Sequence, residues 1–371
     1  MTAEFKNNIN KTLYFLTHYF PLVFCFSVCM GSGTITGFIL SCLTILFMPE
    51  LQPKKMMPFI ISFLIIGNNI ENSLVITLVC GILLIIYSLF FNKLKGLFSS
   101  GFSSGLMLAG ALTATVIFTT DYFGIGATGN NVTEMIKSYI SLGFHPNWRG
   151  VLYGTIVLVL MITFPRKFKK AGQYFSASFI ALIFTLVLNL FLNPSDMTSA
   201  ITEIPQIEIS SLKEFFALKS HTNFNISSVI SGVALFIISA CSFSSDKNIT
   251  SGDCLLYSCS DILSCGLFSL PFPYGINKNK KTVAPRIIAV MIISGLFLIF
   301  KDIIPRIPLH SCAVIIIVTA WENVKWKEIR SSFSDVFSFL IFVFSFAFSM
   351  LTDLSFGTVI TFIAILLYNK I

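Results

Sequence analysis

The sequence predicts an all-α, polytopic membrane protein. Hydrophobic residues make up 55% of the chain and charged residues only 11%, and the mean hydropathy is +0.84. A soluble domain cannot bury this much apolar surface in one core. Apolar runs recur from residue 13 to residue 368, and at about 20 residues per span they fill the chain with roughly a dozen spans. We therefore expect one transmembrane domain over residues 1–371.

The first half holds a series of apolar segments separated by short polar turns. They cover residues 13–30, 35–48, 57–67, 73–91, 101–119, 150–164 and 174–192. The segment 57–67 is too short to cross about 30 Å of hydrocarbon at 1.5 Å per residue, so we expect a half-helix or part of a re-entrant pair. Small residues throughout 101–119 predict close helix packing.

The loops of the first half indicate its orientation. Residues 165–170, with sequence PRKFKK, form the strongest cytoplasmic marker of the chain. Residues 120–148 are polar with few cations, and we expect an external loop there. The polar, acidic stretch 193–225 is also expected to be external.

The second half repeats this pattern and adds an amphipathic piece. Its apolar segments cover residues 226–243, 255–270, 283–300, 309–319, 336–350 and 354–368. Residues 321–333 combine aromatic and cationic side chains, as in a helix that lies on the cytoplasmic membrane surface.

The chain is organised around residues 261–286, where an apolar run ends in Pro271-Phe272-Pro273 and a lysine-rich turn follows. Irregular backbone at membrane depth is tolerated only when it is buried in protein or lines a cavity. A half-helix that starts after such a break directs its free N–H groups and positive dipole end at the cavity, which suits an anion. The alternative is an ordinary loop with lysines at the cytoplasmic surface.

Interrupted segments therefore occur early in both halves, at 53–67 and at Pro271. Such a pair is the usual sequence sign of an inverted-repeat transporter with a site at the bilayer midplane. Asp261 lies inside an apolar run and is a functional candidate by default, as a proton site or a partner of Lys278, or else a structural partner of backbone groups.

Other functional classes lack support in the sequence. We see no basic face with exposed aromatics, so we expect no nucleic-acid partner. No Ser–His–Asp order, phosphate-binding loop or paired carboxylate suggests an enzyme, and we expect no cofactor. The nine cysteines read as small buried hydrophobes. His18, His145 and His310 have no metal-ligand spacing, so we expect no metal site, and we expect satisfied interfacial histidines.

Four short motifs carry a family resemblance. They are GLFSLP at 266–271, IPL at 307–309, KWKEIR at 325–330 and DLSFG at 353–357. In this order and spacing the chain resembles the sulfate permease (SulP, or SLC26-like) anion transporters over nearly its whole length. The resemblance implies two inverted seven-span repeats, 14 spans in all, with UraA/SLC26-like core and gate domains. The repeats would cover about 13–192 and 226–368, with half-helices at the third and tenth spans and the anion between them.

The resemblance also implies site residues, position by position. Lys278 matches the family's Arg at the start of the tenth span. The other expected substrate-binding residues are Asn277, Asn279, Tyr274, Gly275, Pro53, Lys54, Cys25, Ser239 and Ser242. Ser239 and Ser242 lie where many members carry an acid on the eighth span, which weakens coupling to protons or sodium at that site and leaves Asp261 as the coupling candidate. The link between the second and third spans is short, and we expect no STAS domain.

These expectations together describe a secondary active transporter of a small anion, sulfate-like, bicarbonate or related, that works by alternating access. The alternatives are a nucleobase-type transporter of the same fold, and an anion channel or non-transporting scaffold. The expected setting is the plasma (inner) membrane, with multiple passes through the bilayer. The expected partners are a small inorganic or organic anion, a co-transported H⁺ or Na⁺, the lipid bilayer and a second copy in a homodimer.

Overall fold

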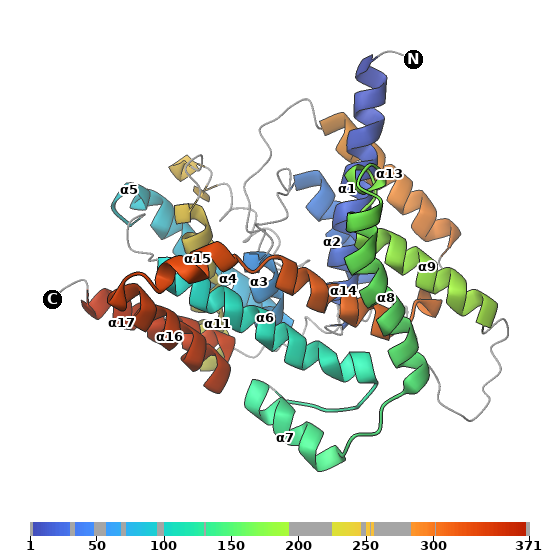
Figure 1. Ribbon diagram of the computed structural model, residues 1–371. Helices are drawn as coiled ribbons and strands as arrows, with labels where there is room; N and C mark the ends of the chain where they lie inside the picture. Colours follow the sequence, from blue (N-terminus) through green and yellow to red (C-terminus); the bar gives the residue numbers. More distant parts are fainter. Residues whose placement is uncertain are drawn as a thin grey trace.

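Every regular element among the described residues is a helix, in agreement with the predicted class (Figure 1). The computed structural model describes residues 3–29, 34–47, 57–67, 72–94, 100–129, 131–192, 225–245, 250–252, 254–255, 283–300 and 302–368. Four described helices, α1, α6, α8 and α11, are long and apolar enough to cross a bilayer, and further apolar helices are shorter. The protein is therefore an integral, multi-pass membrane protein.

The helices follow the predicted apolar segments closely. The first half contains α1 (Ala3–Cys29), α2 (Thr34–Phe47), α3 (Met57–Gly67), α4 (Ser73–Leu89), α5 (Phe91–Leu94), α6 (Ser100–Phe123), α7 (Val132–Leu142), α8 (Trp148–Lys167), a 3₁₀ turn (Ala171–Gln173) and α9 (Ala177–Leu192). The second half contains α11 (Ile226–Ser245), α13 (Val283–Ile299), a 3₁₀ turn (Ile304–Arg306), α14 (Leu309–Glu322), α15 (Trp326–Ser332), α16 (Val336–Leu351) and α17 (Leu354–Tyr368).

The prediction of an external loop at 120–148 was wrong in one respect, because this segment contains the end of α6 and the whole of α7. The Asn131 side chain accepts a 2.8 Å hydrogen bond from the backbone N–H of Glu134 and so caps α7. Val132 and Met135 bury one face of this short helix. Two apolar side chains are too few to indicate a membrane span in the sequence, so the segment was predicted to be a loop.

α6 and α14 run through the middle of the described bundle (Figure 1). On one side α6 packs against α16, where a Cβ at Gly105 would lie only 2.6 Å from the carbonyl oxygen of Phe342. On the other side it packs against α14, whose Trp321 indole donates a 2.8 Å hydrogen bond to the Thr115 hydroxyl. The close packing expected from the small residues of this span is confirmed.

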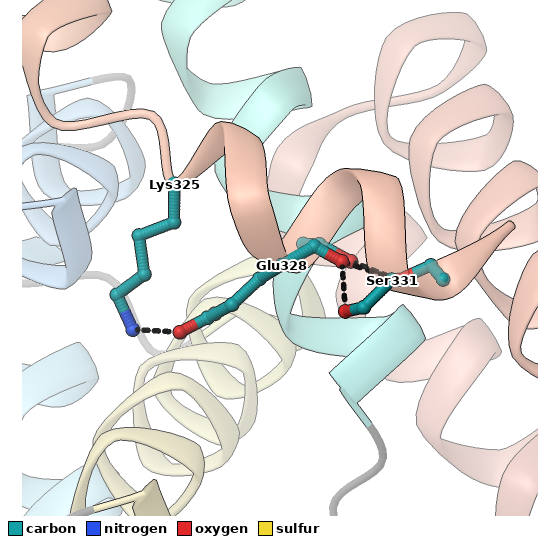
Figure 2. A network of polar contacts seen from close by, with 5 residues as sticks. Lys325, Glu328 and Ser331 are labelled. Carbon is teal, nitrogen blue, oxygen red and sulfur yellow. Dashed lines mark hydrogen bonds and ion pairs between the residues drawn. The ribbon is translucent and has the colours of Figure 1, made fainter. Parts of the chain in front are cut away.

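The amphipathic piece at 321–333 is shorter than expected, because Trp321 still belongs to α14 and α15 begins at Trp326. Figure 2 shows the ion pair at its start, 2.9 Å between Lys325 Nζ and a carboxylate oxygen of Glu328. The Ser331 hydroxyl donates to the Glu328 carbonyl at 2.8 Å. Ile329 is buried while Trp326 stays half exposed, as in a helix lying at an interface.

Candidate functional site

Most of the predicted binding residues lie outside the described residues. These are Lys278, Asn277, Asn279, Tyr274, Gly275, Pro53, Lys54 and the coupling candidate Asp261. Their roles remain predictions. The described residues add Cys25, Ser239, Ser242 and the helices around them.

Cys25 is fully buried on α1. Its thiol contacts that of Cys312 on α14, which also contacts the thiol of Cys29 one turn further along α1. Between these cysteines, Phe26 stacks on Phe63 of α3 with ring centroids 4.8 Å apart and meets the ring edge of Phe118 on α6 at 6.0 Å. The C-terminal turns of α1 are thus held by α3, α6 and α14 together.

Ser239 and Ser242 lie on α11, which packs against α4, α17 and α3. The Ser239 side chain is 1% exposed, and its hydroxyl has no hydrogen-bond partner among the described residues. The same holds for Ser27 on α1. A buried hydroxyl left unpaired costs about 1–3 kcal/mol, so these two positions are good candidates for contact with a polar ligand.

The short helix α3 lies between the two groups of predicted residues. α1 reaches it through Phe26 and Phe63, and α11 packs on it directly. Its 11 residues would extend about 16 Å, half of the hydrocarbon thickness. Ile60, Ile61 and Leu64 are almost completely buried, and Gly110 of α6 allows Ile61 to approach closely. A helix that is apolar on all sides belongs inside protein, not at a surface loop.

Arg286 is a buried cation whose contacts the sequence did not reveal. It is 2% exposed in the first turn of α13, and its Nη1 donates to the carbonyls of Ile45 at 2.9 Å and Leu46 at 3.4 Å. The guanidinium carbon lies 4.4 Å from the ring centroid of Phe15. Because α2 ends shortly before Pro53 and α13 begins shortly after Lys278, Arg286 connects the helix before the first interrupted segment to the helix after the second. A cation inside an apolar run was a signal that could have identified it.

The expectation of a satisfied histidine was wrong for His310. This residue is 0% exposed at the start of α14, and neither ring nitrogen has a hydrogen-bond partner among the described residues. The imidazole occupies space left by Gly124 and Gly150, and a Cβ at Gly124 would lie 3.1 Å from its Nε2. In contrast, His18 hydrogen-bonds to the Tyr14 carbonyl at 3.1 Å, as expected.

The comparisons with known proteins show similarity in structure and not in sequence. No family model matches the chain, and no curated protein matches its sequence. The transmembrane domain of a cyanobacterium bicarbonate transporter, BicA, superimposes with a TM-score of 0.62 at 13% identity, over 98% of both chains. The overall structure of SLC26A9 gives 0.65 at 12% identity, over 98% of this chain and 66% of that one. The chain has the fold of the SLC26 membrane domain.

A third structure agrees with this assignment. The murine Slc26a9 anion transporter in the inward-facing state gives a TM-score of 0.61 at 10% identity, over 99% of this chain and 68% of that chain. The chain thus spans about two thirds of the SLC26A9 chains and nearly all of the BicA domain. The resemblance inferred from the four motifs is confirmed at the level of the fold.

Proposed function

We propose that the protein is a secondary active transporter of a small anion that works by alternating access in the plasma (inner) membrane. The observation that carries the proposal is the short length and burial of α3. This helix is half a span long and buried on all sides, and it lies in a chain with the SLC26 membrane-domain fold. If α3 is a half-helix, one of its ends would lie inside the protein, which is what a midplane site requires.

In this proposal α3 and a second half-helix after Pro271 belong to two inverted repeats. Each half-helix directs a positive N-terminal end at the anion. Lys278 adds a point charge, flanked by Asn277 and Asn279, and the backbone N–H groups of Tyr274 and Gly275 act as donors. Pro53 and Lys54 open the first half-helix.

The described helices would supply the walls of this site. Cys25 and Ser27 on α1 and Ser239 and Ser242 on α11 bring small polar groups to either side of α3. Hydroxyl and thiol donors suit a small, hydrated oxyanion such as bicarbonate or sulfate, since each can replace a lost water.

Arg286 supports the arrangement from a distance. Cations are favourable at a helix C-terminus, and Arg286 hydrogen-bonds to the last turn of α2. In this proposal Arg286 holds the end of α2 against the start of α13 while the protein passes through its transport cycle.

Uptake by purified protein in proteoliposomes tests the function. Labelled bicarbonate, sulfate, chloride and uracil are offered in turn, and exchange against unlabelled internal substrate is measured for each. We expect saturable uptake and counterflow of at least one inorganic anion and none of uracil. Uracil uptake alone, or anion flux that does not saturate and shows no counterflow, would contradict the proposal and favour the nucleobase-type transporter or the channel, respectively.

A further inference from the structure

Asp121 is an acidic residue at the end of a described membrane-spanning helix. It lies in the last turn of α6 and is partly buried. Glu322, by comparison, is exposed at the end of α14. An ionisable group in such a position is a candidate functional site by default. Asp121 was not a candidate from the sequence, because the span was expected to end at Thr119.

The described groups that face Asp121 include no compensating positive charge. From α1 the thiol of Cys29 faces it, from α14 the thiol of Cys312, and from α7 the phenol of Tyr139. α3 and α16, which also pack on α6, carry no ionisable side chain. The cations of the other helices packed on α6 are all exposed: Lys137 of α7, Arg149, Arg166 and Lys167 of α8, and Lys327 and Arg330 of α15. His310 faces Gly124 and Gly150 instead. Among the described residues, no ion pair involves Asp121.

Tyr139 gives a second, independent observation, because its polar group is buried without a hydrogen-bond partner among the described residues. Its hydroxyl is buried and has no well-formed hydrogen bond in the described part of the chain, although the Thr120 side chain lies nearby. Burial, and then the nearby Asp121 carboxylate, raise the pKa of this phenol, so it stays protonated and able to donate. α7 thus places a donor beside the Asp121 carboxylate.

The position of Asp121 connects it to a seam between helices. Phe26 of α1 meets Phe118 of α6 at 6.0 Å. Three residues further along each helix, Cys29 faces Asp121. The carboxyl group therefore lies at the same seam that the thiol contacts of Cys312 hold together, with α1 on one side and α6 and α14 on the other.

We propose that Asp121 is a proton-binding site that controls the opening of this seam and thereby couples anion transport to protons. When protonated, the carboxyl is neutral and fits among thiols and a phenol. When ionised, it is an unpaired charge in poorly polar surroundings, which favours a state in which water enters the seam. The link to transport rests on the proposed function, whereas control of the seam does not.

Labelling of Cys29 tests the seam without any transported anion. Proteoliposomes are treated with a membrane-impermeant maleimide at about pH 5 and about pH 8.5, a range that spans titration of a buried carboxyl, and modification of Cys29 is quantified by peptide mass spectrometry. Dividing the Cys29 modification of wild type by that of Asp121→Asn at each pH cancels the intrinsic pH dependence of the thiol's reactivity. We expect this modification ratio to be near one at the lower pH, and we expect wild type to be modified about three times as much as Asp121→Asn, or more, at the higher pH.

Two variants guard against trivial explanations. Asp121→Glu keeps a titratable group and should keep the response, and Glu134→Gln, which removes an exposed acid on α7, should behave as wild type. If the Cys29 modification ratio between wild type and Asp121→Asn does not change with pH, the proposal of a proton site at Asp121 is wrong, whatever the transport assays show.

Transport provides the second readout. An inward proton gradient should stimulate anion uptake by wild type, and Asp121→Asn should lose this stimulation but keep counterflow exchange. If the labelling ratio responds to pH and a transporting wild type ignores the gradient, the coupling is wrong and the seam switch stands. If no anion is transported at all, the proposed function fails and labelling alone decides the site.

Discussion

The Nη1 of Arg286 donates a 2.9 Å hydrogen bond to the backbone carbonyl of Ile45, across most of the chain's length in sequence. The contact satisfies carbonyl groups that α2 leaves unpaired at its C-terminus. It also places a cation at the negative end of the helix dipole. One side chain thus fixes the end of α2 to the start of α13.

Replacing Arg286 by Leu should lower stability by about 2–4 kcal/mol, because buried carbonyls at the end of α2 lose their donor. Thermal unfolding in detergent, followed by loss of the monodisperse peak, measures the change. The matched control is Arg149→Leu at the exposed start of α8, which should change stability by less than about 0.5 kcal/mol. Equal effects of the two variants would count against a structural role for Arg286.

Gly105→Ala should destabilise the α6–α16 contact by about 1–3 kcal/mol, since the added Cβ would meet the Phe342 carbonyl at 2.6 Å. Gly172→Ala is the control, because a Cβ added there would have no atom within 4 Å and its backbone φ is not positive. The same thermal assay compares them. Wild-type stability in Gly105→Ala would show that the two helices are further apart than described.

Mild oxidation should join α1 to α14 through Cys312 and either Cys25 or Cys29, whose thiols it contacts. The bond forms when an oxidant such as hydrogen peroxide, itself reduced to water, removes two electrons and two protons from the paired thiols. Peptide mapping should find the cross-link in wild type and lose it in Cys312→Ala. If transport needs the seam to open, the cross-linked protein should also be inactive, and a reductant should restore it.

The start of α16 should contribute a small pH dependence to stability. Asp335 accepts a 3.0 Å hydrogen bond from the backbone N–H of Ser338, and this bond, with the Ser338 hydroxyl, lowers the pKa of the carboxyl. A depressed pKa means that the stabilisation is present above the unfolded-state value and is lost as the pH falls through the folded-state value. Asp335→Asn, which keeps an acceptor, should therefore flatten the decline of Tm in acid relative to wild type. Parallel Tm curves for the two proteins would rule out this contribution.

The helices could be predicted from the sequence because their apolar runs are long and bounded by glycine, proline or charge. The bounds of α3 and the start of α17 match the predicted segments. α7 could not be predicted, because only Val132 and Met135 of its residues bury an apolar face. Hydrophobicity marks membrane spans well and short surface helices poorly.

The structure describes only part of the predicted site, and the roles of its residues stay predictions. Cys25 and Ser239 are buried on helices that contact α3. The contacts of Arg286, His310 and Asp121 could not be foreseen from local sequence, because the groups around these side chains come from segments far along the chain. The Arg286 contact, for example, joins positions 241 residues apart.

The most direct test of the account is anion uptake by Lys278→Ala in proteoliposomes, compared with Lys280→Ala from the same lysine-rich turn. Reconstitution is matched by protein content and by monodispersity before mixing with lipid. We expect Lys278→Ala to lose uptake by about tenfold or more, because the proposed half-helix end alone would hold the anion weakly, and we expect Lys280→Ala to retain uptake. Unchanged uptake in Lys278→Ala would contradict the proposed anion site.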